Sequence, residues 1–530
     1  MLKMKNLIRR TLIILLIVSA LMTLLLLDIN GSFATTFIIK SYRPAIVSDE
    51  RGGAFMAIYD LEEEKTFTQH LDSSGNFTWE SSGAVTPASS AENLMIYDGK
   101  DGVILVWDGE IQGIQGLYAQ RLDSSGNTVW NDNGVLVHKR IGGESPGWLS
   151  DSAVVPDNGG GAIIIWKRLE GSCPIYAQKI DSYGNTIWDT SGIQVAQNSD
   201  RYKEIDCISD GMGRAIIIWS EITYTEYKTA EYKVIAQRLD EAGNILWGRS
   251  GKLIGSDYYD YKIISDGNCG AVVVFCNYQQ DITFLNLDNA GKIVWGEENN
   301  TGFTTVGHVY SLEILPNGSG GMFLVWAEEY TGRNIFRDDT NIYAQQIDSL
   351  GNPVWEKGSV AICTAVGDQN YPKLVTDISG GFITTWQDFR DDSRYLFTQR
   401  VDVSGNTLWV KNGVNLGRYY YPFRDFEMFS NGLGGAVIIR EEGESLEPRI
   451  FSQVVDRNGD SIEPETSLFP ACLPRIKQDY EAVIGSTTVF YSPEKSIWIW
   501  LIPLSIFVIL FVLFVIIKSR RNQKISKIQN

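Results

Sequence analysis

The sequence predicts an all-β fold, an eight-bladed β-propeller of four-stranded antiparallel blades, followed by a C-terminal transmembrane helix. Two observations support the propeller: one segment of the chain recurs eight times, and a Gly-rich turn with a short apolar run precedes each copy. The helix is predicted from an uncharged stretch near the C-terminus. The formal net charge of −18 over 530 residues argues against a nucleic-acid-binding surface, which would need to be basic.

The N-terminal residues 1–34 are predicted to be a signal peptide or a signal anchor. Four basic residues precede an uncharged run over residues 11–27. Ala34 ends a Ser-Phe-Ala sequence whose small residues fit signal-peptidase cleavage, and both alternatives stay open. Either one places the residues that follow outside the cell.

The recurring segment reads D-x-x-G-N-x-x-W in its clearest copies, at 119–130, 177–188 and 236–247. All eight copies contain the Asp and the Gly, the closing Trp is missing only from the last, and a Gln precedes the Asp by three residues in seven. Eight copies of one catalytic residue would serve no reaction, so a structural role is predicted. We expect the Asp to cap the turn, the Gly to permit its φ, the Trp to pack between blades and the Gln to satisfy buried backbone groups.

The second motif is a Gly-rich turn followed by a continuous apolar run, as in residues 154–166. Such a run is too short for a helix and suits a strand covered on both faces. Each unit then contains two hairpins, and eight units form the propeller over residues 35–469. We expect residues Thr35–Ile39 to complete the last blade and close the ring, which would leave no free sheet edge.

The loops between the second and third strands vary most in length, so they are predicted to form the binding face. Acidic residues begin these loops, and we expect them to share one rim. They are Asp108, Glu110, Glu221, Glu328, Glu329, Asp388, Asp391 and Glu441. The rim would bind a cation, a basic partner or a sugar, or would be only a solvated surface.

The hairpin segment resembles the tryptophan-docking repeat of quinoprotein dehydrogenases, which are eight-bladed propellers, and residues 287–295 (LDNAGKIVW) are its nearest copy. The adjacent cysteine pair of those enzymes is missing, so the resemblance implies the architecture and not the quinone chemistry. A second likeness is to the sialidase Asp-box. The sequence is most similar to the D-x-x-G-N-x-x-W repeats of secreted and surface-anchored propeller proteins of microbes, which imply no particular reaction.

The C-terminal part is predicted to contain a stalk (470–495), a transmembrane helix (496–517) and a basic cytoplasmic tail (518–530). A helix over 496–517 would be about 33 Å long, enough to cross a hydrocarbon core of about 30 Å. Basic residues follow it, and the positive-inside rule places them in the cytoplasm. The sequence therefore predicts a single-pass cell-membrane protein with its propeller outside.

No cofactor is predicted from the sequence. Residues 456–463 carry oxygen ligands at a spacing similar to a Ca²⁺ loop, but they also form the eighth hairpin copy, which is the favoured interpretation. The six cysteines show no C-x-x-C spacing, so free thiols and disulfides stay open. A G-x-S-x-G match at 143–147 falls between two blades, where a nucleophile elbow is not expected.

These observations predict a membrane-anchored extracellular binding or scaffold module for a protein, a glycan or an envelope component. The alternative is a surface hydrolase, such as a glycosidase with two carboxylates near the propeller axis. A calcium-stabilised spacer is a third possibility. An enzyme is less favoured because the sequence supplies many acids without defining the spacing of any two of them, and the fold alone does not imply the activity.

Overall fold

The computed structural model describes residues 41–60, 65–79, 83–87, 93–140, 152–168, 172–199, 205–224, 230–256, 258–277, 281–296, 302–305, 307–329, 339–355, 358–418, 426–442 and 449–462. The predicted signal segment, the closing segment Thr35–Ile39, the stalk, the transmembrane helix and the tail all lie outside these residues. Within the described ranges, no helix is long and apolar enough to cross a membrane.

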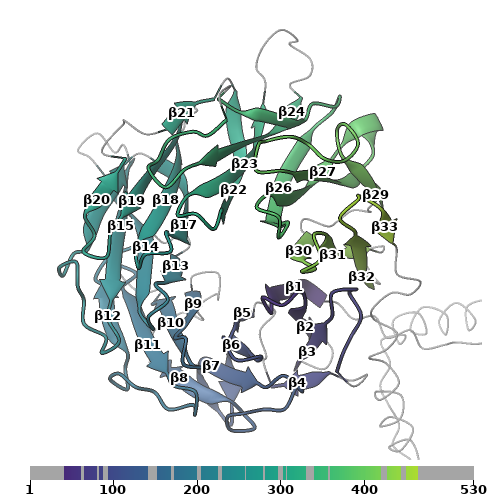
Figure 1. Cartoon of the computed structure of the whole chain (residues 1–530). Coiled ribbons are helices and arrows are strands. Elements are labelled where there is room, and N and C mark those ends of the chain that lie inside the picture. The colour runs from purple at the N-terminus through teal and green to yellow at the C-terminus, as the bar shows by residue number, and fades with distance from the viewer. Residues whose placement is uncertain are drawn as a thin grey trace, which may run out of the picture. The chain divides into compact units, whose positions relative to one another are not determined.

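The described strands form eight sheets, each built from one continuous part of the chain (Figure 1). The first four blades are β1 (Ser41–Ser48), β2 (Ala54–Asp60), β3 (Lys65–Leu71) and β4 (Ala84–Thr86); β5 (Leu94–Tyr97), β6 (Val103–Ile111), β7 (Ile114–Leu122) and β8 (Val135–Lys139); β9 (Ser152–Pro156), β10 (Ala162–Lys167), β11 (Ile175–Ile180) and β12 (Ile193–Ala196); and β13 (Asp206–Ser209), β14 (Ala215–Tyr224), β15 (Ala230–Leu239) and β16 (Lys252–Ser256). The last four are β17 (Tyr258–Ser265), β18 (Ala271–Asn277), β19 (Asp281–Leu287) and β20 (Ile293–Trp295); β22 (His308–Pro316), β23 (Met322–Glu329), β24 (Thr340–Ile347) and β25 (Val360–Cys363); β26 (Gln369–Thr376), β27 (Phe382–Asp388), β28 (Tyr395–Val401) and β29 (Val414–Arg418); and β30 (Phe426–Ser430), β31 (Ala436–Glu442), β32 (Arg449–Val455) and β33 (Ser461–Ile462).

Every blade is an antiparallel meander, in which neighbouring strands follow one another in the chain. The fifth blade has an additional strand, β21 (Gly302–Thr304), which also pairs with β19. The prediction of eight four-stranded antiparallel blades is confirmed. A meander brings the first and third turns of each blade to one end of the sheets, which is called here the turn face. The loop between the second and third strands lies at the other end, which is called the loop face.

The ring closes through direct packing of the eighth blade on the first. The first strands of neighbouring blades contact one another around the centre, ending with β30 against β1 (Figure 1). Met56 of β2 shares a hydrophobic cluster with Phe429 and Ile439 of the eighth blade. The Ser452 hydroxyl donates to the carbonyl oxygen of Gly75 at 3.1 Å across the same junction.

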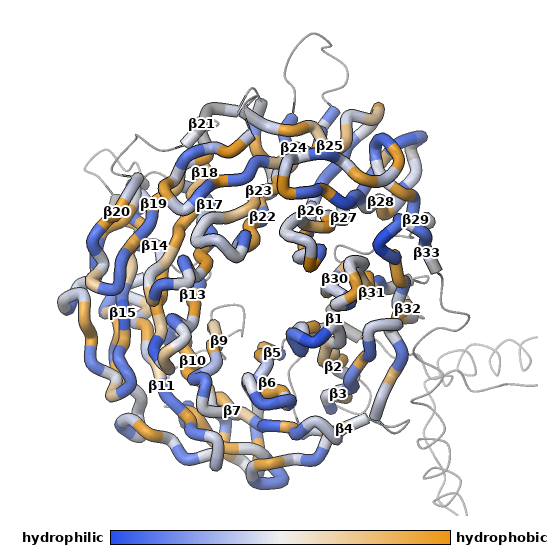
Figure 2. The backbone as a smooth tube through the Cα atoms, viewed as in Figure 1, coloured by the Kyte–Doolittle hydropathy of each residue, from blue (hydrophilic) through white to orange (hydrophobic). Residues whose placement is uncertain are grey.

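The second strand of each blade is covered on both faces, as its apolar sequence predicts. Strand β10 is buried along its whole length. Ile164 packs in a cluster with the preceding blade, while Ile163 and Ile165 pack in a cluster with the following blade. Figure 2 shows hydrophobic residues in the second strands, for example in β14. Burial on alternating sides therefore joins each blade to both of its neighbours.

The hairpin Trp of one blade lies against the hairpin Gly of the next. The Trp188 Nε1–H donates to the Glu241 carbonyl oxygen at 3.2 Å, and a Cβ on Gly243 would lie 3.0 Å from the indole. The same Trp–Gly contact recurs at the six other junctions that have the Trp. At the junction without it, Gly75 meets the side chain of Ser452 instead. The prediction that this Trp packs between blades is confirmed.

The repeated Gln and Asp hold the hairpins through hydrogen bonds. Gln120 Oε1 accepts from the backbone N–H groups of Arg121 and Trp130. The Asp123 carboxylate accepts from the N–H and the side-chain amide of Asn127. Burial raises the pKa of Asp123, but these hydrogen bonds outweigh it and hold that pKa below its ordinary value. The pKa is lowered in the same way for Asp181, Asp240, Asp348, Asp402 and Asp456.

Candidate functional site

The predicted acidic residues of the loop face mostly lie in strands and not in loops, which corrects the sequence prediction. Those in strands are Asp108, Glu110, Glu221, Glu328, Glu329, Asp388 and Glu441. The physical reason is that the strands continue to pair beyond the ends expected from the sequence. For example, β14 and β15 remain paired up to Tyr224 and Ala230. Asp391 lies outside a strand, in the short 3₁₀ turn η2 (Arg390–Asp392), and is exposed.

Three of these carboxylates accept a hydrogen bond from the indole N–H two residues earlier in the same strand. Trp326 donates to Glu328 at 2.9 Å, and Trp386 donates to Asp388 at 3.1 Å. Glu221 accepts in the same way at 3.3 Å. Strand residues two apart point to the same side, so the spacing W-x-[DE] already places each acid beside its indole. Glu328 is 6% exposed and Asp388 is fully buried, so neither belongs to an exposed rim.

Asp388 belongs to a clamp in the seventh blade. Its two carboxylate oxygens accept from Arg390 Nε at 2.7 Å and from Arg390 Nη2 at 2.6 Å. The guanidinium lies 3.6 Å from the centre of the Phe397 ring and donates to the Asn412 carbonyl oxygen at 3.3 Å. Burial raises the pKa of the nearby Cys363 thiol to about 11, so this thiol stays protonated and is a poor nucleophile. The hydrogen bonds of Arg390 join the η2 turn to Asp388 of β27 and to the turn before β29.

Asp108 is also engaged in a structural contact. Its carboxylate accepts from Arg140 Nη2 at 2.6 and 2.7 Å. Burial raises the pKa of Asp108, and the charge of Arg140 only partly offsets this.

Two predicted carboxylates, Glu110 and Asp391, are exposed on the loop face. Glu110 accepts from Gln115 Nε2 at 3.1 Å. Glu329 is half-buried, and the side chain of Glu441 lies outside the described residues. Whether these acids bind a ligand stays a prediction.

A cavity of about 220 Å³ lies between the fourth and fifth blades. It is lined from the end of β16, the start of β17, β18 near its end, the middle of β19 and, towards the turn face, the start of β20. Ser256 and Tyr258 place one end of the cavity at the loop face. Its lining residues are Leu253, Ile254, Gly255, Ser256, Tyr258, Phe275, Thr283, Phe284, Leu285, Ile293 and Gly296. None of these residues was predicted from the sequence as a site residue.

The cavity lies where the fifth blade departs from the repeat. In four other blades a Trp of the second strand stacks on an aromatic ring opposite it in the third; the pairs are Trp107–Tyr118, Trp166–Tyr176, Trp326–Tyr343 and Trp386–Phe397. In the fifth blade the residues at these positions are Phe275 and Thr283. Leu285 also replaces the repeated Gln. Side chains smaller than the two rings of those four blades leave the space open. An alignment of the eight copies would have revealed this signal.

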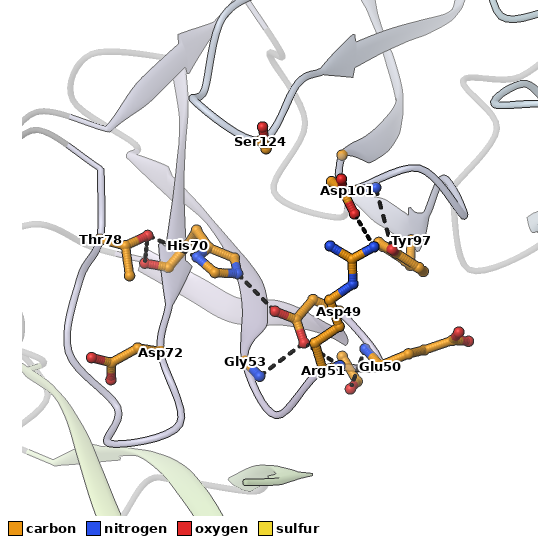
Figure 3. Close-up of polar contacts among 12 residues, drawn as sticks. Asp49, Glu50, Arg51, Gly53, His70, Asp72, Thr78, Tyr97, Asp101 and Ser124 are labelled. Atoms are coloured by element: carbon orange, nitrogen blue, oxygen red, sulfur yellow. Dashed lines mark hydrogen bonds and ion pairs between the residues drawn. The ribbon is translucent and has the colours of Figure 1, made fainter. Parts of the chain in front are cut away.

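A Thr–His–Asp series on the turn face has the order of a nucleophilic triad (Figure 3). His70 Nε2 lies 3.0 Å from Asp49 Oδ2, and His70 Nδ1 lies 2.7 Å from the Thr78 hydroxyl. Burial raises the pKa of Asp49, but the hydrogen bond to His70 and two backbone N–H groups hold it below its ordinary value. Cations at the same repeat position make the same pair in other blades: Arg121 with Asp98, Arg238 with Asp210 and Arg400 with Asp377. The series is therefore one copy of a structural pair.

The described residues show no cluster of three or more His, Cys, Asp or Glu side chains that would hold a metal ion. In the hairpin considered for calcium, Asp456 Oδ1 accepts from the N–H groups of Asn458 and Asp460, as the other turn aspartates do in their hairpins. The five described cysteines are free thiols, and Cys472 lies outside the described residues.

Comparison with known proteins finds no matching family model and no matching curated protein. Among solved structures, the chain is similar to the BP39L lectin from Burkholderia pseudomallei, at 9% identity over 70% of this chain and 96% of that one, with a TM-score of 0.42. It is also similar to an endo-arabinase from Bacteroides thetaiotaomicron, at 12% identity over 48% and 94% of the two chains, with a TM-score of 0.26. A Hadza microbial sialidase, Hz136, matches at 12% identity over 63% and 71%, with a TM-score of 0.30.

Proposed function

We propose that this protein is a membrane-anchored extracellular binding module that engages its ligand with the loop face. The difference between the two faces carries the proposal. The turn face repeats hairpins whose Asp carboxylates and Gln amides bond the hairpins' own backbone. The loop face carries loops of unequal length and the cavity between the fourth and fifth blades. A rigid ring with one variable end is a scaffold suited to recognition.

The anchor and the extracellular location rest on the sequence alone, on the predicted helix at 496–517 and the segment 1–34. The ligand would be a glycan, a protein or another envelope component. Binding is favoured over hydrolysis because a glycosidase needs two available carboxylates flanking the scissile bond. Asp108 and Asp388 are instead paired with arginines, and Glu328 accepts from the Trp326 indole and the Gly307 N–H.

The test measures binding of the full chain, purified in detergent, to immobilised surface fractions from its own organism. One fraction is untreated, one is treated with periodate to destroy glycans, and one is treated with protease. We expect binding to the untreated fraction, and the treatment that abolishes binding identifies the class of ligand. Failure to bind the untreated fraction would contradict the proposal.

Variants in which acidic side chains are replaced by neutral amides identify the face that binds the ligand. Glu110→Gln with Asp391→Asn alters two exposed acids of the loop face. Glu50→Gln with Asp132→Asn removes the same charge from exposed positions on the turn face and is the matched control. A ligand held by the acidic side chains is weakened by the first pair of changes and not by the second. Equal weakening by both pairs would argue against a specific face.

A further inference from the structure

We propose that the cavity between the fourth and fifth blades binds one neutral sugar unit of a glycan. This inference rests on the proposed function, because it assigns a ligand class to the same face. It uses three properties of the cavity: its aromatic wall, a hydroxyl without a partner among the described residues, and the absence of charge among the described lining residues.

The aromatic wall is formed by Tyr258 and Phe275, whose ring centres lie 4.6 Å apart with the planes inclined by 26°. Phe284 also lines the cavity. A sugar ring presents C–H groups on one face and hydroxyls at its edge, so it can pack against aromatic rings while keeping polar contacts.

Gly255 makes room for this wall. A Cβ at this position would lie 2.9 Å from the Tyr258 ring and 3.2 Å from the Phe275 ring. Gly255 is not among the glycines with a positive φ, so its lack of a side chain serves space and not backbone conformation. The aromatic pair is therefore seated directly over the last strand of the preceding blade.

The hydroxyl belongs to Thr283. Its Oγ1 is buried and has no hydrogen-bond partner among the residues that the structure describes. A buried polar atom without a partner costs free energy, and a ligand hydroxyl would relieve that cost. In the fifth blade two separate strands pair with β19. Gly302 of β21 lies opposite Thr283, and Trp295 of β20 lies opposite Asn286.

The size and charge of the cavity select the ligand. About 220 Å³ is below the roughly 300–1,000 Å³ of pockets for drug-sized molecules, so one ring fits and a disaccharide would extend outside. None of the described residues that line the cavity is charged. An acidic sugar would bury its carboxylate without a cation, which is unfavourable, so a neutral sugar is expected.

The experiment titrates the full chain in detergent with methyl glycosides of neutral hexoses and of N-acetylglucosamine, with methyl glucuronide as the acidic comparison. Saturation-transfer NMR detects binding, and calorimetry gives Kd. We expect at least one neutral glycoside to bind, with a Kd of about 1 mM for a single unit, and methyl glucuronide not to bind. Thr283→Val keeps the shape and removes the hydroxyl, and should weaken binding about tenfold. Thr283→Tyr introduces the ring present in three other blades and should abolish binding.

Thr186→Val, in a hairpin on the turn face, is the matched control and should leave Kd unchanged. Binding that survives both Thr283 substitutions would overturn the assignment of this cavity. If no neutral glycoside binds while the untreated surface fraction still does, this inference fails and the proposed function stands. If neither binds, both fail.

Discussion

The contact between the hairpin Trp and the next hairpin Gly gives a quantitative prediction for Gly243→Ala. Gly243 has a φ of +84°, and its Cβ would lie 3.0 Å from the ring of Trp188. A positive φ costs an L-residue about 1–2 kcal/mol. Crowding a fixed ring adds about 1–3 kcal/mol, and the ring is fixed because Trp188 is buried and its N–H bonds to Glu241. The total loss in the free energy of unfolding should be about 2–5 kcal/mol.

Gly211→Ala separates the two contributions. Gly211 belongs to the same blade and has a φ of +81°, but nothing lies within 4 Å of its Cβ position. Urea denaturation should therefore show a loss of only about 1–2 kcal/mol for this control. In a Trp188→Ala background, the cost of Gly243→Ala should fall to that of the control, because the clash is gone. Equal losses for Gly243→Ala and Gly211→Ala in the native background would refute the packing role of the Trp.

Three further predictions follow from the ion pairs, the turn carboxylates and the sequence. Arg238→Gln leaves the buried carboxylate of Asp210 without its cation and should lower the free energy of unfolding by about 3–5 kcal/mol. Adding Asp210→Asn copies the neutral Asn–Gln combination of the sixth blade and should recover most of that lost stability. A double variant as unstable as the single one would contradict this. Asp49 and the six turn aspartates named above have pKa values below their unfolded values, so the unfolded chain takes up protons first as the pH falls. Their contribution to stability is complete above about pH 5 and is lost as the pH falls through their folded pKa values. A urea midpoint unchanged from pH 7 to 2.5 would argue against it. The full chain should resist alkaline carbonate extraction from membranes and a variant ending at residue 495 should not; release of the full chain would contradict the predicted span at 496–517.

Much of the architecture could be predicted because each blade repeats the same local chemistry. The Asp, Gly and Trp of the hairpin each act within one turn or against the next copy, so one pattern defines the blade and its junction. Likewise, the apolar run of β10 predicts a strand covered on both sides, and the structure confirms it. The local repeats are therefore sufficient to predict the blades and the two faces of the propeller.

The candidate site was harder to predict because it depends on where side chains point and on which residues are smaller than usual. Charge alone suggested that Glu328 and Asp388 were exposed, but their position two residues after a Trp places them against an indole. The cavity depends on Phe275 and Thr283, neither of which has a chemical signature of its own. Their meaning emerges only when the fifth blade is compared with the four blades in which an indole and a second ring fill the same positions.

The most direct test of recognition at the loop face is hydrogen–deuterium exchange of the full chain with and without its surface fraction or the best-binding neutral glycoside. Amides become protected where a ligand covers or stabilises the backbone. We expect protection in β16, at the end of β18 and in the middle of β19, with the strand 3–4 hairpins of the other blades unchanged. Protection confined to those hairpins, on the turn face, would contradict the proposed binding face.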